Sequence, residues 1–124
     1  MRFRKFDLVM KSYTDLQQSK KLAEILSLES ADMYWDYDVQ KHEYYPMVMD
    51  DQFDDTCIRA WSLAALLSSL PFPVLYMEMV AGMIFWCCEC HFIETDEVVK
   101  IKHYDNSVDA CVAMIEKLHE LNLL

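Results

Sequence analysis

Residues 87–91 carry a dense group of side chains that could bind a metal, in the order Cys87-Cys88-Glu89-Cys90-His91. Zinc binds four thiolate, imidazole or carboxylate groups in a tetrahedral arrangement. The surrounding apolar residues predict a β-strand, however, and successive side chains of a strand point to opposite faces. Cys87, Glu89 and His91 are therefore expected on one face, with Cys88 and Cys90 on the other. No more than three of these groups can converge, and the usual Cys-x-x-Cys spacing is absent.

A metal site on this strand would need a ligand from another part of the chain, such as His103 on the following strand or Cys57. The candidate metal ligands are Cys87, Cys90, His91 and His103. Free cysteines commonly serve as small apolar core residues, and we favour that interpretation here. The sequence therefore predicts no cofactor, and metal binding is the alternative.

A cysteine–histidine nucleophile is a second chemistry open to these residues, for example Cys90 with His103 across a strand pair. It requires a thiol of lowered pKa and an oriented base, and neither is visible in the sequence. We predict no catalytic residue. A small metal- or thiol-dependent enzyme built on residues 87–91 is kept as the alternative hypothesis.

Acidic residues crowd the stretch from Glu29 to Asp55, which holds nine acids and one base, Lys41. This is either a solvated face or a surface offered to a basic protein partner. The candidate partner-binding residues are Asp36, Asp38, Asp50, Asp51, Asp54 and Asp55. Asp36 and Asp38 could also pair as general acid and base, but outward strand positions are normally polar. The loop aspartates lack the alternating pattern of a calcium loop.

Composition excludes several classes of function. The net charge of −10 argues against direct binding to nucleic acid, which requires clustered Lys and Arg. Gly82 is the only glycine, whereas dinucleotide fingerprints, phosphate-binding P-loops and Gly-x-Ser-x-Gly elbows each need several. The metalloprotease motif His-Glu-x-x-His is absent as well.

Five cysteines without a signal peptide indicate a reducing compartment, so we expect a cytoplasmic protein. The apolar stretch Val74–Ile93 is long enough to span a membrane. It contains Glu78, Glu89 and His91, however, and charges inside a span are costly. Two strands are the favoured interpretation, and no membrane association is predicted.

The first half of the chain predicts a helix followed by two strands. Residues 2–10 could form an initial strand, and Thr14 with Gln17 forms a capping box for a helix to about Leu26. Residues 33–39 alternate, and the residues expected on the apolar face are Met33, Trp35, Tyr37 and Val39. A turn leads to a strand over residues 44–49, which Pro46 should place at a sheet edge.

The second half predicts a short helix, three strands and a final helix. Ser62 is a good N-cap, and Pro71 limits the helix that follows. Gly82 marks a turn between strands, and residues 98–103 form another strand. In the last helix Asn106 supplies the cap, and the apolar stripe consists of Val108, Cys111, Val112, Ile115, Leu118 and Leu121.

This order of elements predicts a single α+β domain over residues 1–124. We expect an antiparallel β-sheet of about five strands with two or three helices packed on one face. Nine Met and sixteen aromatic residues would suit the core, but surplus Met and Tyr on a sheet face would also suit a protein interface. A homodimer, including a purely structural homo-oligomer, is therefore a further hypothesis.

Three blocks, residues 30–35, 60–71 and 109–124, resemble a family of small uncharacterised proteins from Bacteroides-type gut bacteria, their mobile elements and their phages. Asn122 stands where a glycine would be expected near the last helix end, and it can also adopt the left-handed conformation. The resemblance implies a mobile-element or phage context and no activity. The leading hypothesis is a non-enzymatic protein-interaction or accessory domain acting through an acidic or Met/Tyr-rich surface.

Overall fold

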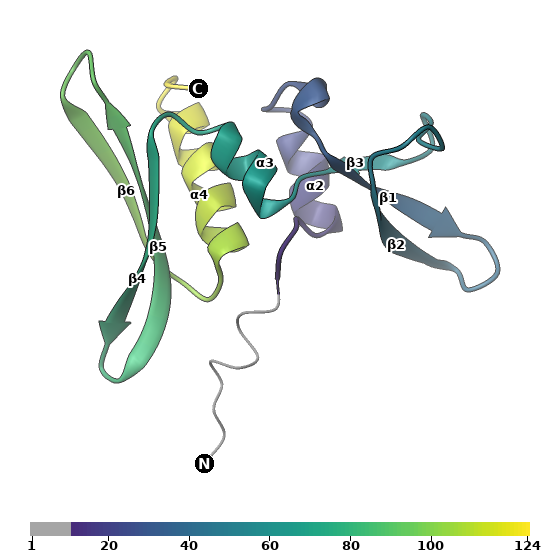
Figure 1. Ribbon diagram of the computed structural model, residues 1–124, viewed down its shortest axis with the longest axis horizontal. Helices are drawn as coiled ribbons and strands as arrows, with labels where there is room; N and C mark the ends of the chain where they lie inside the picture. Colours follow the sequence, from purple (N-terminus) through teal and green to yellow (C-terminus); the bar gives the residue numbers. More distant parts are fainter. Residues whose placement is uncertain (1–10) are drawn as a thin grey trace.

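The computed structural model describes residues 11–124 and shows an α+β fold with two antiparallel three-stranded sheets. The smaller sheet has the order β2–β1–β3 and consists of β1 (Met33–Asp38), β2 (Glu43–Val48) and β3 (Ile58–Ala60). The larger sheet has the order β4–β5–β6 and consists of β4 (Pro73–Val80), β5 (Met83–Phe92) and β6 (Glu97–Tyr104). Figure 1 shows the helices lying between the two sheets.

Three α-helices and one 3-10 turn, η1 (Leu28–Ser30), complete the described chain. The helices are α2 (Leu16–Leu22), α3 (Leu63–Ser68) and α4 (Ser107–Glu120). Helix α4 packs on β5 and β6, α3 packs on α4, and α2 packs on β3. One apolar core joins these elements, and its buried side chains include Leu22, Trp61, Leu66, Cys88, Met114 and Leu118.

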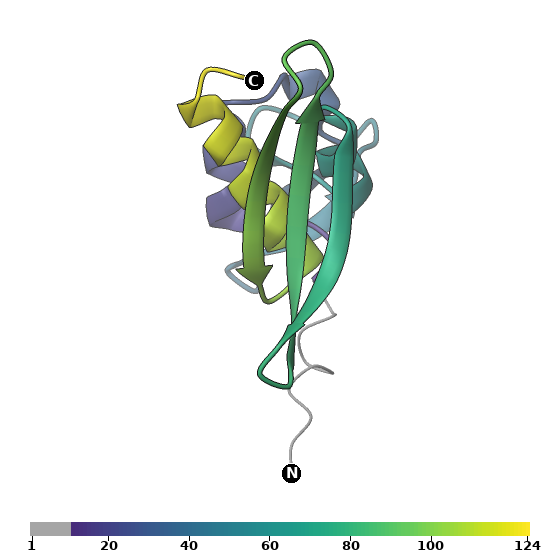
Figure 2. The same ribbon diagram turned by 90° about the vertical axis from the view of Figure 1, so that its left-hand side faces the viewer.

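The expected single sheet of about five strands is therefore wrong, although the antiparallel α+β class is confirmed. The sequence pattern missed β3, which pairs with β1. Helix α3 then leads the chain from β3 to β4, where a separate sheet begins. Helices cover one face of the larger sheet, as Figure 2 shows, and no element of residues 11–124 covers its outer face.

The last helix begins and ends as its sequence predicts. The Asn106 side chain accepts a hydrogen bond from the Asp109 amide at 2.8 Å. Asn122 adopts a φ of 59°, and the Leu123 amide donates to the Leu118 carbonyl at 2.8 Å. These contacts form a Schellman motif with Asn in the position that Gly usually holds. Leu121 is exposed, however, so it does not belong to the predicted apolar stripe.

Helix α2 begins one residue later than predicted, because Thr14 is held elsewhere. Asp15 is the N-cap and forms the capping box with Gln18. The Thr14 amide donates to the Trp61 carbonyl at 2.9 Å, and the Thr14 hydroxyl accepts from the Trp61 amide at 3.1 Å. The helix also ends at Leu22, earlier than expected. The predicted strand over residues 2–10 lies outside the described residues.

The long apolar stretch Val74–Ile93 forms most of the β4–β5 hairpin. A two-residue turn, Ala81–Gly82, joins these strands and pairs Val80 with Met83. Both turn residues have positive φ, 52° and 81°, as a type I′ turn requires. Among the described residues, no helix combines the length and apolar character needed to cross a membrane.

The smaller sheet buries a different side chain from the one that alternation predicts. Met33 and Trp35 are only half-buried, whereas Tyr34 on the opposite face is fully buried. The loop after β2 causes this, because its Phe53 packs on Tyr34 with ring centroids 5.4 Å apart. Strand β2 lies at a sheet edge, as Pro46 predicts.

Candidate functional site

Strand β5 distributes its cysteines over both faces of the larger sheet, as alternation predicts. Cys88 and Cys90 point into the apolar core, together with Cys111 of helix α4. Hydrogen bonding to Cys88, together with burial, raises the pKa of both Cys90 and Cys111. All three thiols are fully buried and therefore act as core residues, and Cys90 cannot join Cys87 in one metal site.

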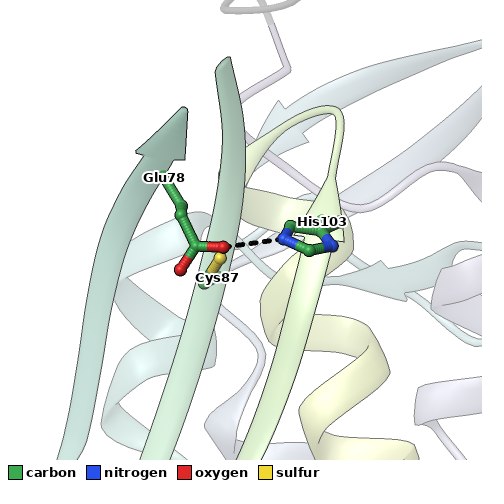
Figure 3. Close-up of side chains that lie close together, drawn as sticks. All are labelled: Glu78, Cys87 and His103. Carbon is green, nitrogen blue, oxygen red and sulfur yellow. Dashed lines mark hydrogen bonds and ion pairs between the residues drawn. The ribbon is translucent and has the colours of Figure 1, made fainter. Parts of the chain in front are cut away.

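On the outer face, Cys87 lies between two side chains from the neighbouring strands, Glu78 of β4 and His103 of β6 (Figure 3). One carboxylate oxygen, the thiol sulfur and one imidazole nitrogen all lie within 4.8 Å of one another. We call these three residues the sheet-face cluster. Cys87 is fully buried, while Glu78 and His103 are partly exposed to solvent.

The pKa of the Glu78 carboxyl is lowered in this cluster. Its Oε1 is 2.8 Å from Nε2 of His103, and its Oε2 is 3.8 Å from Nζ of Lys102. The hydrogen bond with His103 is the main cause of the lowered pKa, and the charge of Lys102 adds to it. The carboxylate is therefore ionised at neutral pH and available as a ligand or as a partner for an imidazole.

A β-bulge brings His103 to the outer face. Trp86 pairs with Tyr104 and Cys88 pairs with Ile101, so two residues of β6, Lys102 and His103, lie opposite the single residue Cys87. His103 has a φ of 71°, which is unusual for a residue other than glycine. The extra residue lets both Lys102 and His103 reach Glu78.

Of the four candidate metal ligands, the structure brings together Cys87 and His103 only. His91 lies on the same face as Cys87 but contacts Glu89, with Nε2 3.3 Å from Oε1. Nζ of Lys100 lies 4.0 Å from the other carboxylate oxygen of Glu89, Oε2. Burial and a hydrogen bond with Glu89 raise the pKa of Tyr76 to about 12. Glu89 thus belongs to a second polar group beside the sheet-face cluster.

Glu78 was missed as a ligand when the sequence was considered alone. The turn contains a sequence signal that could have identified Glu78 as a neighbour of Cys87. A two-residue connection at Ala81–Gly82 sets the register of β4 on β5. That register places Tyr76 opposite Cys87 and Glu78 opposite Phe85, so Glu78 lies diagonally across from Cys87. Diagonal neighbours on one sheet face are close enough for long side chains to meet.

The candidate partner-binding aspartates have mostly local hydrogen-bonding roles. Asp38 accepts from the Gln40 and Lys41 amides in the hairpin turn, and Asp54 accepts from the Thr56 amide. Asp51 accepts from the Gln52 side chain, and Asp55 is exposed in the same loop. Such bonds explain why aspartate suits these turns. They leave the negative charge of each side chain at the surface.

Asp36, Asp50 and Asp54 gather on one face of the smaller sheet. Asp36 and Asp54 each lie 3.7 Å from the Cys57 sulfur. Asp50 accepts a 2.6 Å hydrogen bond from the Tyr34 hydroxyl, which raises the pKa of Tyr34 well above its usual value. The structure therefore joins three of the six candidates in one acidic group, while Asp38 lies at the end of β1 and Asp51 and Asp55 lie in the loop after β2.

Comparison with family models, with curated proteins and with solved structures finds no match to this chain.

Proposed function

We propose that this protein is a binding module for a basic protein partner and that the β1–β2 hairpin is its contact surface. We call residues 33–48 the tyrosine hairpin. The observation that carries the proposal is its exposed tyrosines: Tyr37 is 41% exposed, Tyr44 36% and Tyr45 39%. Figure 1 shows this hairpin at the end of the molecule away from the larger sheet. Among the described residues, the tyrosine rings are therefore open to a partner.

The tyrosines are held in place on both faces of the hairpin. Tyr37 and Tyr44 are directly opposite one another, with ring centroids 5.0 Å apart in an edge-to-face arrangement. On the other face, the Tyr45 hydroxyl donates to Asp36 at 3.2 Å. Ordered aromatic rings lose little conformational entropy on binding, which is one reason that tyrosine is enriched in interfaces.

The charge around these rings supports a basic partner. Asp36, Asp38 and Glu43 lie on the hairpin itself, and Lys41 is its one Lys or Arg residue. Arg59 of the neighbouring strand is placed over the Phe53 ring, 4.5 Å from its centroid. Carboxylates attract Lys and Arg side chains, and tyrosine faces can bind the same cations.

Recognition through side chains fits the hairpin better than addition of a strand to its edge. Strand β2 is an edge strand, but Pro46 lacks an amide proton and Glu43 adds charge at its start. Both features hinder pairing with an incoming strand. The partner is therefore expected to contact the tyrosine rings and the carboxylates.

Affinity capture from an extract of the native host tests the proposal, with the full chain as bait and captured proteins identified by mass spectrometry. We expect a basic protein whose retention falls with added salt. The double variant Tyr37→Ala/Tyr44→Ala should lower its affinity at least about tenfold, as loss of interface anchors does. Asp36→Asn/Asp38→Asn should reduce retention mainly at low salt.

A matched control removes two exposed acids elsewhere, Glu94→Gln/Glu97→Gln in and beside the β5–β6 turn. This variant has the same net charge as Asp36→Asn/Asp38→Asn and should retain the partner fully. If both charge variants lost the same amount of partner retention, net charge alone would explain the effect. That result would contradict the proposed surface. Light scattering of the purified chain gives a second check by measuring its oligomeric state. If the chain is a dimer that Tyr37→Ala/Tyr44→Ala dissociates, the hairpin is a self-association surface instead of a partner-binding surface.

A further inference from the structure

We propose that Glu78, Cys87 and His103 form a binding site for a zinc-like divalent transition-metal ion on the outer face of the larger sheet. The three side chains come from three adjacent strands, and their ligand atoms lie within 4.8 Å of one another. Figure 3 shows the thiol below the carboxylate oxygen that faces the imidazole. This site is far from the tyrosine hairpin in the fold and does not depend on the proposed partner binding.

The donor atoms select the class of metal. Thiolate sulfur, imidazole nitrogen and carboxylate oxygen together suit zinc and its neighbours, whereas magnesium and calcium prefer several oxygen ligands. In a tetrahedral site with bonds of about 2.0–2.3 Å, the ligand atoms lie about 3.3–3.6 Å apart. The ligand atoms of the cluster already lie within 4.8 Å, and Glu78 Oε1 and His103 Nε2, 2.8 Å apart, must separate slightly to admit an ion. Both side chains are partly exposed and free to make this adjustment. With three protein ligands, a fourth position would remain open towards solvent.

The backbone at His103 provides an independent reason to expect a ligand. In an uninterrupted strand, His103 would point to the same face as Ile101, towards the helices. The bulge opposite Cys87 turns it to the outer face, with a φ of 71°. Left-handed conformations of residues other than glycine cost about 1–3 kcal/mol and gather at functional sites. Here that conformation completes the three-ligand set.

The surroundings of the cluster are compatible with a cation. Lys102 is 3.8 Å from Oε2 of Glu78, on the other oxygen from the one that His103 contacts, and its side chain is partly exposed. It can therefore turn to solvent when an ion binds. The Phe85 ring lies beside His103, with centroids 5.5 Å apart, and limits solvent access from that side.

Burial of Cys87 favours a metal ligand over a nucleophile. A nucleophilic thiol must reach a substrate atom at about 3–3.5 Å, but Cys87 is 0% exposed. A metal ion needs only one sulfur lone pair and can enter between the partly exposed Glu78 and His103 side chains. The same three residues thus fit metal binding better than thiol catalysis.

Cobalt(II) titration of the full, reduced chain tests the site, with zinc used as a competitor. We expect one equivalent of cobalt to produce sulfur-to-cobalt charge-transfer absorption, and zinc to abolish it. Glu78→Gln, His103→Gln and Cys87→Ser should each lower the affinity by at least about tenfold to a hundredfold, which is the loss seen even for groups that only support a ligand. Circular dichroism monitors folding of each variant.

Two control variants keep the test specific. His91→Gln changes a histidine on the same sheet face, and Cys57→Ser removes a thiol outside the cluster; both should bind cobalt like the original chain. If buried Cys87→Ser fails to fold, the partly exposed Glu78→Gln and His103→Gln still decide the outcome. Absence of thiolate absorption at one equivalent, or binding lost in Cys57→Ser but kept in His103→Gln, would overturn the proposal.

Discussion

Cys57 is the one cysteine of the described residues that is not fully buried, and two carboxylates lie beside it. Its sulfur lies 3.7 Å from both Asp36 and Asp54. Burial raises the pKa of Cys57, and the two negative charges raise it further. Because the thiolate is the reactive form, the partly accessible thiol should react slowly at neutral pH.

We predict that Asp36→Asn increases the rate of Cys57 modification, because it removes one of these charges. The measurement is the rate of reaction with a disulfide reagent under native conditions, with Cys57→Ser identifying the reacting thiol. Asp55→Asn provides a control of equal charge change in the same part of the molecule. Equal rates in the two aspartate variants would show that the local charge of Asp36 is unimportant.

Tyr76 links stability to alkaline pH. Burial and the hydrogen bond with Glu89 raise its pKa from 10.0 to about 12. The folded chain thus keeps the phenol proton to higher pH than the unfolded chain does. The resulting stabilisation is complete below about pH 10 and is lost as the pH rises from about 10 to about 12.

Tyr76→Phe should therefore show a shallower loss of stability over that pH range than the original chain. Urea unfolding at several pH values between 8 and 12 would measure it, where the range is set by the rise in pKa from 10.0 to about 12. Tyr37→Phe, a change to an exposed tyrosine on the smaller sheet, is the matched control. Parallel pH profiles for Tyr76→Phe and the original chain would contradict the prediction.

At the scale of elements, the β4–β5 turn is strained at Ala81, since type I′ turns favour Asn or Gly at that position. Ala81→Asn should stabilise the chain by up to about 1 kcal/mol, because Asn adopts the left-handed conformation more readily than Ala. Gly82→Ala should destabilise it by about 1 kcal/mol through its positive φ alone. No heavy atom lies within 4 Å of the added Cβ, so a steric clash makes no contribution.

Urea denaturation of both turn variants measures these changes in the free energy of unfolding. Ala113→Gly, on helix α4, serves as a comparison in which the same type of residue is replaced within a helix and should destabilise. Stabilisation by Ala81→Asn together with destabilisation by Ala113→Gly would confirm the role of backbone conformation. The left-handed turn would then be the reason that replacing Ala81 increases the free energy of unfolding. A destabilised Ala81→Asn variant would contradict the assigned turn.

At the scale of the whole molecule, Asp109 connects elements that are distant in the sequence. Its Oδ1 accepts from Lys11 Nζ and Gln18 Nε2, both at 2.8 Å, and its Oδ2 accepts from Asn106 Nδ2 at 2.9 Å. Burial alone would raise the pKa of Asp109, but the hydrogen bonds and the charge of Lys11 outweigh it and hold the pKa below 3.8. Stability from this group is present above that value and is lost as the pH falls through the lower, folded-state pKa.

Asp109→Asn should lower the free energy of unfolding by about 1–3 kcal/mol at neutral pH, as loss of hydrogen bonds to a charged group does. The difference from the original chain should shrink in acid, because protonation removes the same charge. Thermal or urea unfolding across this pH range provides the measurement. The exposed Asp105→Asn is the control, and an equal effect of both variants would contradict the central role of Asp109.

Much of the secondary structure was predictable because caps, turns and alternation act between residues close in the chain. Asn106, Ser62, Pro46 and Gly82 have the roles that their positions indicate. Strand alternation also separated Cys87 from Cys88 and Cys90 correctly. The predicted start of α2 was wrong because Thr14 makes hydrogen bonds to Trp61, a residue 47 positions away.

The sequence by itself determined the antiparallel α+β class and the placement of the β5 cysteines on two faces. Only the tertiary structure decided the division into two sheets, the burial of Tyr34 beneath Phe53, and the meeting of Glu78 and His103 around Cys87. The physical reason is the separation along the chain between the residues that interact. Local backbone preferences specify each element, whereas a loop crossing a sheet or a bulge opposite one residue depends on packing between distant segments.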